Sequence, residues 1–184
     1  MPLLPVTFAG GGDGLWRVTR LEAVVGESLP QVPRLAVLEG ESGTAPDSAV
    51  WVLRGVTGHE RYVERREREA LAASQQPLGR PDATRAALIP IRKSEAWWDL
   101  TQDERRTVFE TRSRHIATGL EYLPAVARRL NHSRELGEAF DFLTWFEYAA
   151  EHAAAFEELA DRLRRTEEWR YVEREIDIRL ARDP

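Results

Sequence analysis

The sequence predicts an α+β fold, in which helices cover one face of an antiparallel sheet. Three observations support this prediction. Residues 83–184 follow the order strand, helix, strand, strand, helix, strand, which is typical of the ferredoxin-like split motif. Residues 1–82 hold short apolar segments separated by glycine and proline, as strands do. The chain has 184 residues, 42% of them hydrophobic, and can bury a core without disulfides or structural zinc.

The first half is predicted to be mainly β-structure. β-branched and apolar residues concentrate in three segments, and residues 40–48 (GESGTAPDS) form a loop by composition. The predicted strands are 15–25, 34–39 and 49–56.

Two further segments of the first half need an interpretation. Residues 10–14 (GGGDG) lack the Gly-Lys-Ser/Thr that completes a phosphate-binding loop, so we interpret them as a flexible turn. Residues 60–74 are predicted to be helical, because Glu64 and Arg68, of opposite charge, are four positions apart. This half is therefore interpreted as a degenerate ferredoxin-like module that lacks a helix.

The second half is more regular. Thr101 and Glu104 have the spacing of a capping box, which predicts a helix start. Charged and apolar residues alternate from Tyr171 to Leu180, as in a strand. The predicted strands are 83–93, 124–136, 140–149 and 169–181, and the predicted helices are 94–100, 101–120 and 149–165.

These elements predict two modules, residues 1–82 and residues 83–184. Their sheets would join into one sheet or a barrel, an architecture of the dimeric α/β-barrel type.

Composition excludes several classes of protein. The chain has no cysteine, which excludes thiolate metal sites, thiol catalysis and disulfides. Its net charge of −5 argues against non-specific nucleic-acid binding. The first twelve residues do not resemble a secretory signal, and no apolar run reaches about 20 residues. We therefore expect a cytoplasmic protein that binds neither nucleic acid nor membrane.

His115 is the candidate metal ligand. Because the only methionine is residue 1, the iron of a haem would take its axial ligand from a histidine or a tyrosine. His115 falls at the edge of the apolar stripe of the predicted helix 101–120, where an imidazole can reach iron from a dry wall. The alternative is a core histidine that is hydrogen-bonded to a backbone carbonyl.

Arg128 is the candidate anion-binding residue. It precedes Arg129 on a predicted strand, so the two side chains point to opposite faces. Arg128 shares its face with Val126 and Leu130, and a guanidinium on an apolar face needs an anion or a carboxylate. Arg128 is therefore either an anion clamp or a member of a structural ion pair.

Charged residues beside tryptophans supply further candidates. Lys93 precedes the adjacent Trp97 and Trp98, and could hold a haem propionate while the indoles pack against the ring edge. Glu167 or Glu168 could accept the second N–H of a metal-bound histidine. The alternatives are a solvated lysine, a tryptophan pair in a core or interface, and a solvated pair of carboxylates.

Taken together, these segments resemble the chlorite dismutase family, in particular its short, usually dimeric lineage. The similarity extends from about Trp51 to Arg182, and the first fifty residues match only loosely. The matching stretches are WVLRGVTGHERYVERRE, LGRPDATRAALIPIRKSEAWWDLTQDERR, RHIATGLEYLPAVARRL, FDFLTWFEYA and TEEWRYVEREIDIRLAR.

The resemblance implies ferredoxin-like modules, one haem b per subunit in the C-terminal module, and a homodimer. His115 matches the iron ligand, and Arg128 matches a mobile arginine on the other side of the haem. Glu168, or else its neighbour Glu167, matches the carboxylate bonded to that histidine. The remaining matches are Lys93 at the propionates, Gln75 as the residue that can hold the arginine when it swings inward, and Trp97, Trp98 and Thr144 around the haem pocket.

The resemblance also implies an activity, the conversion of chlorite to chloride and dioxygen with formation of an O–O bond. The charge of Arg128 would draw in the anion and keep its reactive fragment beside the iron. The nearest rival is a coproheme decarboxylase of the same superfamily, which lacks the arginine and relies on a tyrosine. The sequence is also compatible with a haem-binding or sensing protein and with a haem-free interaction protein.

Overall fold

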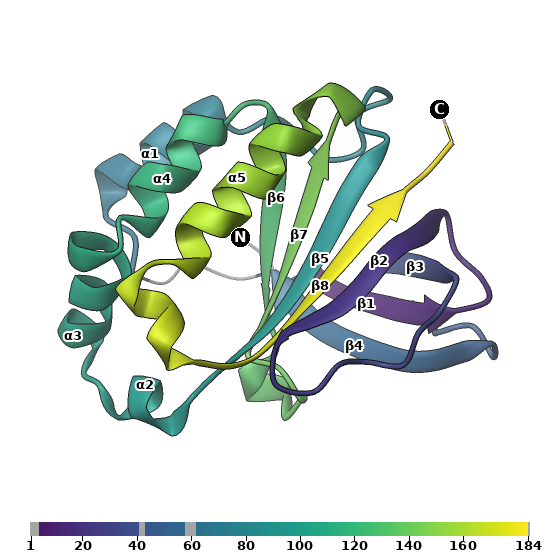
Figure 1. Ribbon diagram of the computed structural model, residues 1–184, viewed down its shortest axis with the longest axis horizontal. Helices are drawn as coiled ribbons and strands as arrows, with labels where there is room; N and C mark the ends of the chain where they lie inside the picture. The colour runs from purple at the N-terminus through teal and green to yellow at the C-terminus, as the bar shows by residue number, and fades with distance from the viewer. Residues whose placement is uncertain (1–3, 41–42, 58–61, 184) are drawn as a thin grey trace.

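The computed structural model describes residues 4–40, 43–57 and 62–183. Within these ranges, eight strands form one closed barrel in the order β1-β3-β2-β8-β5-β7-β6-β4, with antiparallel pairing between the neighbours (Figure 1). The strands are β1 (Leu4–Gly11), β2 (Trp16–Val25), β3 (Arg34–Glu39), β4 (Ala49–Thr57), β5 (Arg85–Lys93), β6 (Val126–His132), β7 (Phe142–Tyr148) and β8 (Val172–Ala181).

The α-helices of the described residues cover one side of this barrel. Figure 1 shows α4 and α5 across the outer face of β5 to β8, on the side away from β1 to β4. None of the helices in the described ranges is both long enough and apolar enough to cross a membrane. The α-helices are α1 (Arg65–Ser74), α2 (Glu95–Asp99), α3 (Gln102–Arg106), α4 (His115–Tyr122) and α5 (Ala153–Arg164).

The predicted order of elements in residues 83–184 is the observed one, since β5, the α2–α4 region, β6, β7, α5 and β8 follow one another. The two halves join through pairing of β8 with β2 and of β6 with β4. Of the joined sheet and the barrel that the sequence predicts, the structure has the barrel. The first two residues of the predicted helix 60–74 lie outside the described ranges.

Strand β1 was not predicted, and the interpretation of residues 10–14 as a turn is wrong for its first two residues. Gly10 and Gly11 belong to β1, which pairs with both β3 and β4. At Gly10 a Cβ atom would lie 2.2 Å from the ring of Trp51, so glycine lets the indole pack on the strand. The glycines therefore serve close packing in a strand rather than flexibility.

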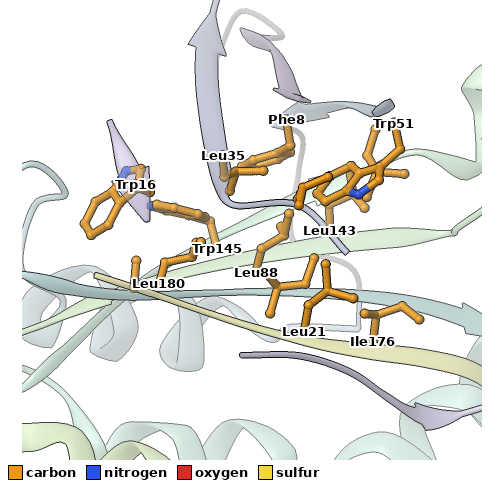
Figure 2. Packing of buried hydrophobic residues seen from close by; sticks show 14 of the residues in the cluster. Phe8, Trp16, Leu21, Leu35, Trp51, Leu88, Leu143, Trp145, Ile176 and Leu180 are labelled. Atoms are coloured by element: carbon orange, nitrogen blue, oxygen red, sulfur yellow. The ribbon is translucent and has the colours of Figure 1, made fainter. Parts of the chain in front are cut away.

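Aromatic side chains fill the inside of the barrel (Figure 2). The ring centroids of Phe8 and Trp145 are 5.6 Å apart, and Trp16 meets Trp145 edge-on at 5.5 Å. Alternation along the strands supplies the rest of this core, which includes Leu21, Leu35, Trp51, Leu88, Leu143, Ile176 and Leu180. Since β5 to β8 also pack against helices on their outer face, these strands are buried on both sides.

The single helix predicted over residues 101–120 is broken. The capping box of Thr101 and Glu104 is present and starts α3. A π-helix over Thr107–Arg112 follows α3, and Arg114 then takes a left-handed conformation with φ of 52°. His115 is therefore the first residue of α4 and does not lie late in one long helix.

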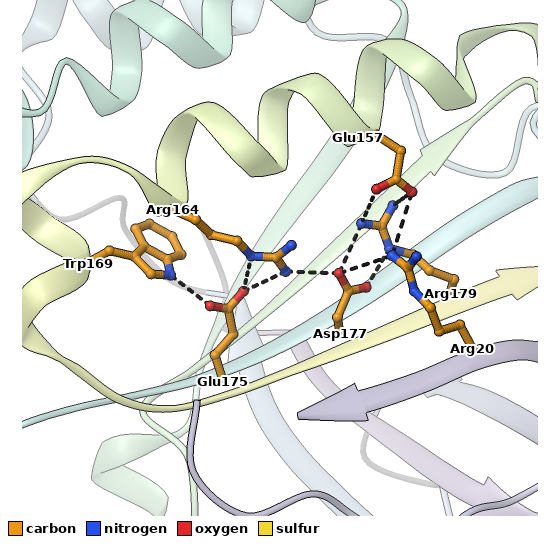
Figure 3. Close-up of polar contacts among 7 residues, drawn as sticks. All are labelled: Arg20, Glu157, Arg164, Trp169, Glu175, Asp177 and Arg179. Carbon is orange, nitrogen blue, oxygen red and sulfur yellow. Dashed lines mark hydrogen bonds and ion pairs between the residues drawn. The ribbon is translucent and has the colours of Figure 1, made fainter. Parts of the chain in front are cut away.

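The charged face of β8 is buried. The alternation of charged and apolar residues along this strand would equally fit a strand whose charged face is in solvent. Helix α5 covers this face, and Glu175, Asp177 and Arg179 are each at most 6% exposed. Figure 3 shows how they are neutralised. Arg164 of α5 donates to Glu175 and Asp177 at 2.8 and 2.9 Å, and Arg179 pairs with Asp177.

Candidate active site

A cavity lies between the outer face of the sheet and helices α4 and α5. Its empty volume is about 1210 Å³, including the part that is open to solvent. We name it the His115 cavity. From the sheet it is lined by Ile89, Ile91, Arg128, Leu130, Phe142, Thr144 and Phe146, and from the helices by His115, Ile116, Gly119, Phe156, Leu159, Ala160 and Leu163. A largely apolar pocket with a few polar groups is the usual form of a cofactor site.

His115 lies on the helical wall with one ring nitrogen engaged. Its Nδ1 is 2.7 Å from Oε2 of Glu168, and its side chain is 25% exposed. Phe109 stacks against the imidazole with 4.4 Å between ring centroids, and Trp169 lies nearly parallel at 6.4 Å. Within the described residues no hydrogen bond engages Nε2 of His115, so this nitrogen can bind a metal in the cavity.

Glu168 is a buried carboxylate with a partner on each oxygen. Oε2 meets His115, and Oε1 accepts from Nζ of Lys93 at 2.7 Å. Burial alone would raise the pKa of Glu168, but the charges and hydrogen bonds of Lys93 and His115 outweigh it and lower the pKa to about 2. Glu168 is therefore ionised at neutral pH and holds Nδ1 of His115 in its N–H form.

The alternatives left open for the carboxylate are now separated by geometry. Glu167 pairs with the exposed Arg112 at 2.9 Å. The backbone N–H of Glu168 donates to the buried hydroxyl of Ser113 at 2.9 Å. Of the two adjacent glutamates, Glu168 is the one that contacts His115.

Lys93 lines the His115 cavity. Its side chain is 3% exposed, and its ammonium is paired with Glu168. The ammonium also lies 4.5 Å from the ring centroid of Trp97 and 5.5 Å from that of Trp169. This ion pair orients Glu168, and the contact of Lys93 with a haem propionate stays a prediction.

Arg128 lines the His115 cavity from the sheet, whereas Arg129 does not. Arg129 points into the barrel and pairs with Glu39, as strand alternation predicts for consecutive residues. Gln75, which follows α1, donates its Nε2 to the backbone carbonyl of Arg128 at 2.7 Å. The predicted role of Gln75, to hold Arg128 when the arginine swings inward, stays a prediction.

The predictions for the remaining pocket residues differ in outcome. Thr144 and Trp97 line the cavity, and Nε1 of Trp97 is buried without a hydrogen-bond partner in the described residues. Trp98 is not among the residues that line the cavity, but it stacks at 6.1 Å on Phe142, which does line it, and it donates to Asp141. Its place around the haem stays a prediction.

Several cavity residues were not predicted at all. Trp169 and Glu175 line the cavity and are joined by a hydrogen bond of 2.7 Å from the indole N–H (Figure 3). Arg164 lines it as well and pairs with Glu175. The alternation of β8 was the one signal for Glu175, and a strand with a solvated face has the same pattern.

The donor set suits a planar metal cofactor rather than a bare ion. In the described part of the chain, no three His, Cys, Asp or Glu residues gather as ligands for an ion. One imidazole on an apolar wall, an arginine on the sheet and an unpartnered indole N–H instead fit a porphyrin. Such a ring needs one axial ligand, apolar contacts for its faces and donors for its carboxylates.

Comparison with known proteins agrees with this geometry. The chain is similar to a dimeric chlorite dismutase from Nitrobacter winogradskyi, at 58% identity over 97% of this chain and 99% of that one, with a TM-score of 0.89. A mutant chlorite dismutase from Candidatus Nitrospira defluvii has a TM-score of 0.70 at 19% identity over 98% and 92% of the two chains, a likeness of fold alone.

Sequence matches point to the same family. The chlorite dismutase of Ideonella dechloratans is 42% identical over 67 residues, which are 36% of this chain but only 22% of that protein. The family model for chlorite dismutase matches residues 43–183. The chain therefore belongs to the chlorite dismutase family.

Proposed function

We propose that the His115 cavity holds one haem b, with Nε2 of His115 as the axial ligand of the iron. The observation that carries this proposal is the chain of hydrogen bonds from Lys93 through Glu168 to Nδ1 of His115, at the wall of a largely apolar cavity. A carboxylate on the second ring nitrogen fixes the tautomer of a metal-bound histidine and strengthens it as a donor.

The proposed reaction is the conversion of chlorite to chloride and dioxygen, which balances without a further reactant. Bound haem supplies the iron centre at which the chlorine is reduced and the two oxygen atoms are joined. Family membership and the similarity to a dimeric chlorite dismutase support this reaction. Arg128 supplies a cation on the sheet wall of the same cavity, which suits a small oxyanion.

Arg128 acts in this proposal by attracting chlorite and by keeping its charged fragments inside the cavity. A guanidinium is always protonated, and in a water-poor site its field is stronger than in bulk solvent. Gln75 supports the strand at this point through the carbonyl of Arg128. Thr144 and Trp97 are proposed to contact the haem, since both line the cavity.

We also propose that the chain consists of two ferredoxin-like halves, residues 1–82 and residues 83–184. The barrel order supports this division, because β4-β1-β3-β2 and β8-β5-β7-β6 are the same permutation of four strands. Within its described residues, the first half has no helix between β1 and β2 or between β3 and β4, where the second half has helices before β6 and β8. A homodimer is proposed from the dimeric relative, and size-exclusion chromatography with light scattering tests it.

An oxygen electrode tests the reaction directly. Protein loaded with haem should show a Soret band and release about one dioxygen per chlorite consumed. His115→Ala should lose the iron–histidine signature and most of its haem affinity. A Soret band without dioxygen release would leave a haem-binding or sensing protein, and no Soret band after loading would contradict the cofactor.

A further inference from the structure

The helix that carries His115 starts in an unusual way. Its N-cap residue, Arg114, is left-handed and caps nothing with its side chain, because a guanidinium has no acceptor. The first N–H groups of α4 need acceptors from elsewhere, as at every helix start. The preceding π-helix supplies one residue that reaches them.

That residue is Glu110. Its Oε2 accepts from the N–H of Ile116 at 2.6 Å, and its Oε1 accepts from the N–H of Ala117 at 3.2 Å. These are the second and third residues of α4, the positions that a Ser or Asp cap ordinarily satisfies. One carboxylate from upstream therefore holds the turn that begins with His115.

The same short segment also holds the imidazole. Phe109, next to Glu110, stacks on the ring of His115 at 4.4 Å with an interplanar angle of 23°. The backbone N–H of Arg114 donates to the carbonyl of Glu110 at 2.8 Å. Ser113, in the same link, accepts from the N–H of Glu168. Both the backbone and the ring face of His115 are thus fixed to this segment.

We propose that Glu110 is a positioning residue that sets the position and tilt of His115 toward the haem iron. The hydrogen bond that His115 donates to Glu168 restrains only the Nδ1 edge of the ring, so it leaves the placement of the Cα atom and the ring tilt to other contacts. Glu110 fixes the placement of the His115 Cα atom through its hydrogen bonds to the start of α4. Its neighbour Phe109, which stacks on the imidazole, fixes the tilt of the ring. This inference rests on the proposed role of His115 as the axial ligand.

Electrostatics add to this role. The N-terminus of a helix carries a partial positive charge, which would make the imidazole of His115 a poorer electron donor. The carboxylate of Glu110 lies on the N–H groups that carry this charge and offsets it. Removal of the Glu110 carboxylate therefore makes the imidazole of His115 a weaker electron donor and also leaves its position less restrained.

The chain offers a matched control for this test. Glu104 accepts from the N–H of Thr101 at 2.8 Å and so stabilises the start of α3 in a comparable way, but it is exposed and does not line the His115 cavity. Glu110→Ala, Glu110→Gln and Glu104→Ala are compared with the wild type. Haem affinity, the iron–histidine stretching band of the reduced, haem-loaded protein, and thermal unfolding of the haem-free protein are measured.

For Glu110→Ala we expect a loss of haem affinity of about tenfold, the lower end of the effect of outer partners of metal-bound histidines. Its iron–histidine band should broaden and move to lower frequency. Glu110→Gln keeps one accepting oxygen and should recover most of the affinity, but its iron–histidine band should stay broader than that of the wild type, because the second accepting oxygen is lost. Glu104→Ala should unfold at a lower temperature and keep the wild-type band.

A wild-type band and affinity in Glu110→Ala, with only a lower unfolding temperature, would overturn the positioning role. If Glu110→Ala does not fold, Glu110→Gln decides alone, because a wild-type band width at reduced stability would overturn the role in the same way. The variant His115→Ala distinguishes a failure of the positioning role of Glu110 from a failure of the proposed role of His115 as the iron ligand. If the iron–histidine band survives in His115→Ala, the ligand assignment fails and the inference about Glu110 falls with it.

Discussion

Arg128 and Arg129 are neighbours in β6, yet their side chains line two different cavities on opposite sides of the barrel wall. Arg128 faces the His115 cavity, and Arg129 faces the barrel interior, where it pairs with Glu39. Strand alternation is the cause. Variants of the two arginines can therefore distinguish the effect of a cation in the His115 cavity on chlorite turnover from the effect of a cation elsewhere on β6.

Arg128→Ala should keep haem but handle chlorite poorly. We expect kcat/KM for chlorite to fall by about tenfold, the lower end of the gain that a charged cleft gives a small ion. More hypochlorite should escape, and the haem should bleach sooner, because nothing holds the charged fragment near the iron. Stopped-flow and oxygen-electrode traces measure the rate and the yield.

Arg129→Ala is the control and should keep the wild-type yield of dioxygen per chlorite. An unchanged yield and bleaching rate in Arg128→Ala would contradict the role of Arg128. Equal defects in both variants would point to a general effect of charge on β6.

Glu168→Gln tests the carboxylate on His115. The amide of the variant can still contact Nδ1 of His115. It carries no charge, whereas the wild-type carboxylate, with a pKa of about 2, is ionised at neutral pH. We expect the midpoint potential of the haem to rise and haem affinity to fall by about 10-fold to 100-fold. Glu167→Gln changes an exposed neighbour that pairs with Arg112 and should leave both quantities unchanged. Spectroelectrochemistry that finds equal potentials in the two variants would contradict this prediction.

Local signals made part of the fold predictable. The capping box of Thr101 and Glu104 lies within four residues, and period-two alternation marks β8. Strand β1 escaped because Pro5 and its two terminal glycines are residues that strands usually avoid. Its two neighbouring strands and the indole packed on Gly10 overcome that preference.

The site was less predictable, because its contacts join distant parts of the chain. His115 and Glu168 are 53 positions apart, so only the family resemblance could pair them. The resemblance places Lys93 at the haem propionates but gives no sign of its ion pair with Glu168, which is 75 positions away. The periodicity of apolar residues also gave no sign that the helix breaks at Arg114. The new helix start is stabilised by the carboxylate of Glu110, which accepts from the N–H of Ile116 on the other side of the break.

Asp177 predicts a pH dependence of stability. Burial alone would raise its pKa, but the guanidinium groups of Arg179 and Arg164 outweigh burial and lower the pKa below its usual value of 3.8. The unfolded chain therefore takes up this proton at a higher pH than the folded chain does. The stabilisation is complete above about pH 4 and is lost as the pH falls toward the folded pKa.

Asp177→Asn leaves two guanidinium groups short of a partner, and we expect it to lower the free energy of unfolding by about 3–5 kcal/mol at neutral pH. The difference from the wild type should narrow below about pH 4. Asp161→Asn removes an exposed carboxylate of α5 and should follow the wild-type curve. Urea unfolding at several pH values measures this, and a difference that stays constant into acid would contradict the assignment.

Gly10→Ala tests the packing of β1. The added Cβ would lie 2.2 Å from the ring of Trp51, whose indole N–H is held by the carbonyl of Pro30 at 3.0 Å, so the ring cannot simply move away. We expect a loss of about 1–3 kcal/mol in the free energy of unfolding. Gly12→Ala places its Cβ 3.8 Å from the nearest neighbour, Ser48, and should change stability by less than about 0.5 kcal/mol. Equal unfolding curves for the two variants would show that the strand tolerates a side chain against Trp51, and chlorite turnover per bound haem should be unchanged in both.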